Sequence, residues 1–179
     1  MPRYVALFRG INVGKAKRIA MADLRALLAR LGYTEVSTLL NSGNALFTAK
    51  SEPDERHARR IREAVAKQLG VDAAVVVKSQ KEIAGVVEAN ALAKIASDPS
   101  RLLVALVQDD EVLTTVTALQ AEDWGREKVL VSRQAAYVWC ADGILESRAL
   151  GAVQTGLNNL GTTRNWATLL RIHASMVSP

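Results

Sequence analysis

Residues that could bind an anion are concentrated in one segment near the start of the chain. Gly10–Ile19 contains two glycines and three cations, and it follows the apolar run Tyr4–Phe8. A loop after a strand leaves backbone N–H groups free to donate hydrogen bonds. Together with the added positive charge, these groups favour the binding of an anion. The alternative is a mobile basic loop whose glycines only turn the chain. The side chains predicted to bind the anion are Arg9, Asn12, Lys15 and Lys17.

This segment is not a P-loop, although its composition is similar. Gly10 and Gly14 bracket three residues where the P-loop pattern needs four. Ala16 stands where that pattern needs the hydroxyl that holds Mg²⁺. Any phosphate bound here would therefore be held without the P-loop geometry.

A second polar cluster, Asn41–Asn44, has the composition of a tight turn between two strands. Its candidate ligand-binding residues are Asn41, Ser42 and Asn44, and a hairpin turn that needs no ligand is the alternative. We expect this turn and the Gly10–Ile19 loop to lie at opposite ends of their strands. The two clusters then need not form one site.

A third cluster, Thr163–Trp166, is predicted to open the last helix, with Thr162 and Thr163 as its N-cap. Arg164 would lie in the first turn, where a cation opposes the helix dipole. Binding a carboxylate or phosphate with both guanidinium nitrogens would offset that cost, and so would an ion pair with a surface acid. Arg164 and Asn165 are therefore candidate ligand-binding residues, whereas Trp166 is expected in the core.

Apolar spacing predicts a mixed α+β fold built from two tandem ferredoxin-like units with antiparallel sheets. The predicted order in the first unit is strand, helix, strand, strand, helix, strand: Tyr4–Arg9, Ala20–Leu31, Val36–Leu40, Ala45–Ala49, Pro53–Leu69 and Ala73–Val77. The second unit repeats this order in Leu102–Val107, Glu111–Leu119, Lys128–Ser132, Ala136–Cys140 and a helix starting at Ile144–Leu150. The predicted domains are residues 1–78 and 101–179, joined by residues 79–100 with a helix over Ser79–Ile95.

Composition limits the functions that the chain can have. Residues 1–78 carry 14 Lys and Arg against 7 Asp and Glu, whereas residues 79–179 carry 9 against 11. This asymmetry favours an anionic partner for the first half, with a solubilising surface as the alternative. One cysteine, Cys140, excludes an internal disulfide, and a buried inert thiol is expected there. We expect a cytoplasmic protein that does not enter a membrane.

No group of residues predicts a metal site or a catalytic triad, and no cofactor is expected. His57 is placed among the exposed charges of its helix, and His173 has no partner in the sequence. Asp109–Glu111 is expected to cap a helix. Base stacking on the sheet is not supported, because Phe47 is the only aromatic residue in the third strand.

The three polar clusters resemble the bacterial domain-of-unknown-function family 1697, and the resemblance spans nearly the whole chain. It implies two ferredoxin-like subdomains and no established activity. Family members often have a polar residue after the Trp, where this chain has Ala167. The site implied by the family's motifs consists of Arg9, Asn12, Lys15, Asn41, Ser42, Asn44, Arg164 and Asn165.

Three function hypotheses follow. The first is a module that binds a phosphate-bearing small molecule or a nucleic-acid backbone through the basic loop. The second is a transferase-like enzyme acting on a phosphorylated or nucleotide substrate, which requires Asn, Ser and Arg side chains to converge in one pocket. The third is a structural module that forms a homodimer through its apolar strands.

Overall fold

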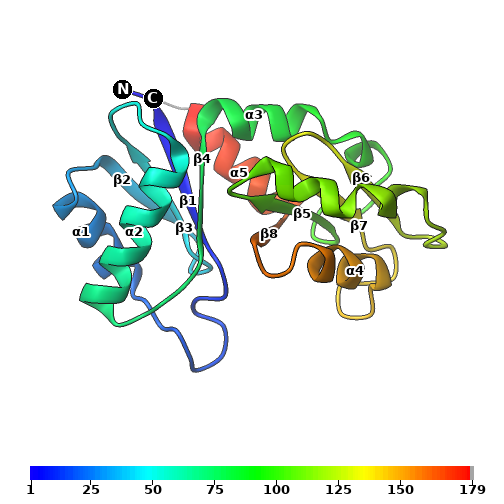
Figure 1. Ribbon diagram of the computed structural model, residues 1–179, viewed down its shortest axis with the longest axis horizontal. Helices are drawn as coiled ribbons and strands as arrows, with labels where there is room; N and C mark the ends of the chain where they lie inside the picture. The colour runs from blue at the N-terminus through cyan, green and yellow to red at the C-terminus, as the bar shows by residue number, and fades with distance from the viewer. Residues whose placement is uncertain (178–179) are drawn as a thin grey trace. The chain divides into compact units, whose positions relative to one another are not determined.

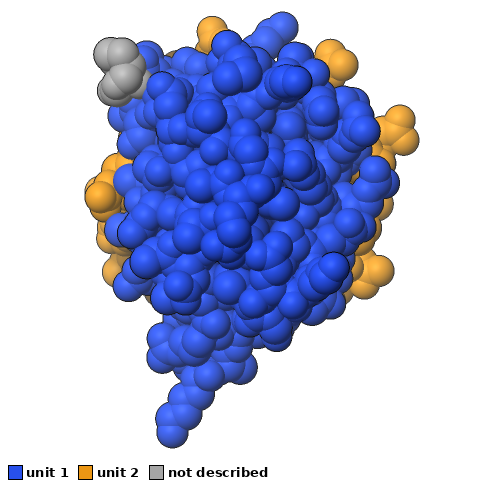
Figure 2. All heavy atoms as spheres, turned by 90° about the vertical axis from the view of Figure 1, so that its left-hand side faces the viewer, with its two compact units in different colours: residues 1–81, 174–179 blue, residues 82–173 orange. Residues whose placement is uncertain are grey.

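The computed structural model describes residues 1–177 and shows a mixed α+β chain with two four-stranded antiparallel sheets (Figure 1). The chain divides into two compact units. Unit 1 contains residues 1–81 and the described residues from Ala174 onward, and unit 2 contains residues 82–173. The heavy atoms of unit 1 are blue in Figure 2, where a narrow projection extends from its lower edge.

Unit 1 consists of one sheet, in the order β2-β3-β1-β4, and two helices. Its core is formed by the helices and one face of the sheet, and includes Phe8, Leu27, Phe47 and Ile61. Its elements are β1 (Arg3–Phe8), α1 (Met21–Arg30), β2 (Thr34–Leu39), β3 (Asn44–Thr48), α2 (Asp54–Leu69) and β4 (Val75–Ser79).

The position of β1 in the sheet explains its unbroken apolar run. It pairs with β3 on one side and β4 on the other, both antiparallel. Ala6 and Phe8 face the helices, and Val5 and Leu7 on the opposite face are also fully buried. A central strand that is buried on both faces has no solvent-facing position for a polar side chain.

Unit 2 has the sheet order β6-β7-β5-β8, and its core lies between β5, β7, α4 and a long 3₁₀ helix. The chain enters it through α3 (Gln80–Glu88). The elements that follow are η1 (Ala91–Lys94), β5 (Leu102–Val107), η2 (Asp110–Ala121), β6 (Lys128–Val131), β7 (Ala136–Trp139), α4 (Arg148–Gly156), β8 (Gly161–Asn165) and α5 (Trp166–Val177). No helix among residues 1–177 is long and apolar enough to cross a bilayer.

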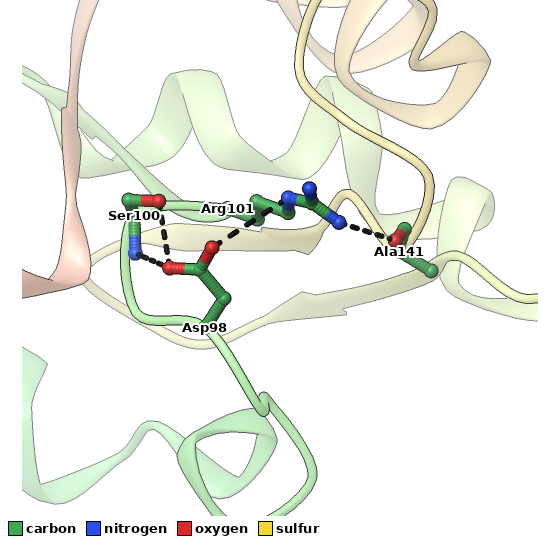
Figure 3. Close-up of polar contacts among 4 residues, drawn as sticks. All are labelled: Asp98, Ser100, Arg101 and Ala141. Atoms are coloured by element: carbon green, nitrogen blue, oxygen red, sulfur yellow. Dashed lines mark hydrogen bonds and ion pairs between the residues drawn. The ribbon is translucent and has the colours of Figure 1, made fainter.

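A turn held by Asp98 leads into β5 (Figure 3). One carboxylate oxygen of Asp98 accepts hydrogen bonds from the Ser100 backbone N–H and hydroxyl, at 2.9 and 2.7 Å. The other oxygen lies 3.6 Å from Nε of Arg101, whose Nη1 donates to the Ala141 carbonyl. The turn thus links the start of β5 to the segment after β7.

The structure corrects the predicted last helix. Gly161–Asn165 forms β8, and Arg164 pairs with Val104 of β5. The N-cap of α5 is Asn165, whose side-chain oxygen accepts a hydrogen bond from the Thr168 N–H at 2.8 Å. Threonines favour both caps and strands, and the hydrogen bonds offered by β5 decide between the two.

Three other predicted helices also differ from the structure. The helix expected over Ser79–Ile95 ends at Glu88, and a 3₁₀ helix follows. The segment after β5 is a 3₁₀ helix where an α-helix was predicted. The Asp109 carboxylate accepts a hydrogen bond from the Glu111 N–H at its start, which confirms the capping prediction. Finally, α4 starts only after Ser147, whose hydroxyl accepts from the Leu150 N–H.

His57 is buried, contrary to the prediction that it lies among exposed charges. Its ring packs in a cluster with Tyr4, Tyr33 and Phe47, and its Nδ1 lies 3.0 Å from the Tyr33 hydroxyl. Burial lowers the pKa of His57 below its usual value of 6.5, against the opposing effect of Glu52.

This lowered pKa predicts a loss of stability in mild acid. Below about pH 6.5 the unfolded chain protonates His57 while the folded chain resists, so the free energy of unfolding falls by up to about 1.4 kcal/mol per pH unit. The free energy of unfolding continues to fall until the pH reaches the pKa of His57 in the folded protein. Urea denaturation at several pH values between about 8 and 5 should show a shallower decline for His57→Phe than for the natural chain. Equal declines would contradict this role.

A second prediction concerns Gly43, in the turn between β2 and β3. Its φ is +87°, and a Cβ there would lie 2.7 Å from the Ile11 side chain and 2.8 Å from the Phe8 Cβ. Gly43→Ala should therefore lower the free energy of unfolding by about 2–4 kcal/mol. The matched control is Gly10→Ala, since Gly10 has φ +65° but no atom within 4 Å of such a Cβ. It should cost about 1–2 kcal/mol, and equal losses for the two variants would contradict the packing argument.

Candidate functional site

The first two polar clusters of the sequence lie at the same end of the unit 1 sheet. Because β1 and β3 are antiparallel and Leu7 pairs with Asn44, the end of β1 meets the start of β3. The Phe8 N–H donates to the Gly43 carbonyl at 2.9 Å. The prediction that the loop and the turn lie at opposite ends is therefore wrong. Figure 1 shows the loop, in blue, extending beyond the end of β1.

The side chain of Asn12 joins the loop to the turn. Its Nδ2 donates to the carbonyls of Ile19 and Asn41 at 2.9 and 2.8 Å, and its Oδ1 accepts from the Ile19 N–H at 2.9 Å. Asn12 has φ 56°, a left-handed conformation that asparagine tolerates better than most residues. Since both ends of its amide are engaged, Asn12 holds the loop in place.

Asn44 has a similar structural role inside the turn. Its side chain is fully buried, and Nδ2 donates to the Leu39 carbonyl at 2.8 Å and to the Ser42 hydroxyl at 3.1 Å. These bonds close the connection between β2 and β3. Asn44 and Ser42 therefore help to shape the turn.

An open cleft of about 410 Å³ lies where the loop, the turn and the start of α1 meet. Its polar side chains include Arg18 and Asn41, both exposed. Neither side chain makes a hydrogen bond or ion pair with any residue between 1 and 177. The residues that line the cleft are Asn12, Arg18, Ile19, Ala20, Met21 and Asn41.

Positive charge dominates the surroundings of the cleft. The sequence has no acidic residue before Asp23, which lies exposed in the first turn of α1. The N-cap of α1 is Ala20, which has no side-chain oxygen to accept from the first N–H groups. Lys17 acts electrostatically on Asp72, whose pKa is lowered chiefly by its hydrogen bond with Arg62. The positive charge of Lys17 is thus partly balanced by the Asp72 carboxylate.

The remaining predicted residues of unit 1 lie on the same loop. Arg9 follows β1, and its backbone N–H donates to the Ala74 carbonyl at 2.9 Å. Lys15 is exposed, and its ammonium makes no ion pair within residues 1–177. The structure therefore brings the predicted residues from Arg9 to Asn44 together at one end of unit 1.

Arg164 and Asn165 belong to unit 2. Arg164 is buried, and its Nη1 donates to the Thr162 hydroxyl and the Thr163 carbonyl, both at 2.8 Å. Burial lowers the pKa of Arg164 to about 10. Asn165 is occupied as the N-cap of α5. Both residues thus have structural roles within their own unit.

Sequence reasoning missed Arg18 and Met21 as cleft residues. The available signal was a cation two residues before the N-cap of a helix, at the end of the basic loop. No cluster of His, Cys, Asp and Glu within residues 1–177 could hold a metal ion. Cys140 is buried as predicted, and burial raises the pKa of its thiol.

Comparison with known proteins gives a family and a fold. A family model described as "Protein of unknown function (DUF1697)" matches residues 1–137, which contain the first two polar clusters. The conserved bacterial protein SP0830 from Streptococcus pneumoniae has a similar structure, with a TM-score of 0.74 and 22% sequence identity over 98% of each chain. No curated protein matches this sequence.

The bracing role of Asn12 can be tested by Asn12→Asp. A carboxylate would place an oxygen against the carbonyls of Ile19 and Asn41, where the amide now donates. The variant should lose about 2–3 kcal/mol in free energy of unfolding, and amide hydrogen exchange should accelerate in residues 13–18.

The matched control is Asn158→Asp. Asn158 also has a left-handed conformation, with φ 45°, but it is exposed, and its side chain forms no hydrogen bond within residues 1–177. This variant should change stability by less than about 0.5 kcal/mol. A similar loss in both variants would show that the Asn12 bonds do not hold the loop.

Proposed function

The chain belongs to the DUF1697 family of proteins of unknown function, and we propose that it binds a phosphate-bearing small molecule in the cleft of unit 1. The observation that carries this proposal is the cleft, where the Arg18 guanidinium, without an ion-pair partner among residues 1–177, and the Asn41 side-chain amide line a space of about 410 Å³. That volume lies within the range of known small-molecule sites, roughly 300–1,000 Å³.

The charge around the cleft supports an anionic ligand. Arg18 and Lys15 are exposed cations without an ion-pair partner among residues 1–177, and a guanidinium can donate two parallel hydrogen bonds to a phosphate. Because the cleft is lined by neither an imidazole, a carboxylate nor a thiol, the proposal is for binding, with the transferase-like function as the alternative.

We further infer that each unit is a ferredoxin-like module and that the chain contains two in tandem. The sheet orders β2-β3-β1-β4 and β6-β7-β5-β8 support this inference, because each puts the first strand of its unit between the third and fourth. Both have the connection order of a split βαβ motif, with η2 in place of the first helix in unit 2. The same comparison supports an internal duplication, in which the second unit repeats the element order of the first.

The binding proposal predicts that Arg18→Ala weakens the affinity for inorganic phosphate and pyrophosphate by about tenfold, because one charge-assisted contact is lost. Isothermal titration calorimetry and thermal shift would measure the change. The control is Arg59→Ala, which removes the same charge from the exposed face of α2. Arg59 lies in the second turn of α2, which follows β3 and so begins at the end of the sheet away from the cleft.

Equal weakening by the two substitutions would point to diffuse attraction and contradict a defined site. Binding of single-stranded RNA or DNA alone, with a steep loss of affinity as salt rises, would favour a nucleic-acid backbone as the partner.

A further inference from the structure

The cleft has an apolar side as well as a cationic one. Ile19, Ala20 and Met21 line it directly beside Arg18. Ile19 is almost fully buried, Met21 is half-buried and Ala20 is exposed. A bare phosphate, or a phosphorylated sugar alone, would leave this apolar surface in contact with water. A ligand that has an apolar part as well as a phosphate would cover this surface.

The Asn41 side chain adds a requirement for hydrogen bonding. A side-chain amide offers one donor and one acceptor next to each other. The main-chain carbonyl of Asn41 is held by Asn12, which fixes the residue at the cleft, whereas its side chain is free within the described chain. This pair of groups matches the edge of a purine that presents a ring nitrogen beside an exocyclic amine, as adenine does.

We propose that the ligand of the cleft is a nucleoside monophosphate with an adenine-like base. The proposal rests on the function proposed above and names its ligand class. Arg18 binds the phosphate, the apolar wall of Ala20 and Met21 receives the base, and the Asn41 amide contacts the edge of the base. The volume of the cleft is within the range of known small-molecule sites.

The test compares four probes that contain different parts of this ligand: inorganic phosphate, ribose 5-phosphate, phenyl phosphate and adenosine 5′-monophosphate. Isothermal titration calorimetry at constant ionic strength should show the tightest binding for adenosine monophosphate. It should exceed phenyl phosphate by about threefold to tenfold, the value of one or two net hydrogen bonds. Equal affinity for these two probes would overturn the proposal.

Variants separate the contributions of the two parts of the cleft. Asn41→Ala should remove the preference for adenosine monophosphate over phenyl phosphate, and Asn158→Ala should keep that preference. Met21→Ala should weaken both aromatic probes by about threefold to tenfold, and Met21→Leu should restore most of this loss because it keeps the apolar volume. Thermal midpoints of all variants would verify that each is folded.

The outcomes distinguish this proposal from the one on which it depends. If all four probes bind equally and all lose affinity in Arg18→Ala, phosphate binding stands and the nucleotide assignment is wrong. An unchanged preference for adenosine monophosphate in Asn41→Ala would also overturn the assignment. If no probe binds, or if Arg18→Ala changes nothing, both proposals fail.

Discussion

Three hydrogen bonds from the Asn12 side chain connect the loop after β1, the turn before β3 and the approach to α1. Each bond contributes only about 1 kcal/mol net, but together they fix a segment that has two glycines and almost no apolar contacts of its own. The side chains of Ile11 and Ile19, at the two ends of this segment, are buried. The Asn12 amide ties the start of the loop to its end and to the turn, so the shape of the cleft depends on this one side chain.

Asparagines of the same polar clusters divide into two groups by what their side chains contact. Asn12 bonds the backbone through both ends of its amide. Asn44 donates to the Leu39 carbonyl and to the Ser42 hydroxyl, so both residues are parts of the frame. Asn41 contributes its main-chain carbonyl to that frame and leaves its side-chain amide in the cleft. A residue whose amide is engaged by its own chain stabilises structure, whereas a free amide on a fixed backbone is available to recognise a ligand. Only their environments distinguish the two groups.

The two units repeat a buried cation at one position of the same frame. Lys78 of β4 pairs with Val5 of β1, and Arg164 of β8 pairs with Val104 of β5. Both cations lie on an edge strand, on the face opposite the helix-covered core of their unit, and both are buried. Burying a charge costs free energy. Because both units bury a cation at equivalent positions, the buried cation belongs to the frame that the two units share. The loops differ, since η2 follows β5 where unit 1 has its basic loop and α1.

The sequence by itself determined the elements whose signals are local. The helix predicted over Pro53–Leu69 is α2, whose buried face includes Ile61 and Val65. The strand predicted over Leu102–Val107 has the same bounds in the structure. Apolar periodicity encodes these features within a few turns or residues of chain. Tertiary structure alone decided that His57 is buried, that Gly161–Asn165 is a strand, and that the loop and turn meet. Each of these depends on a partner distant in sequence, because hydrogen bonding to β5 and the antiparallel pairing of β1 with β3 come from segments that local patterns do not specify.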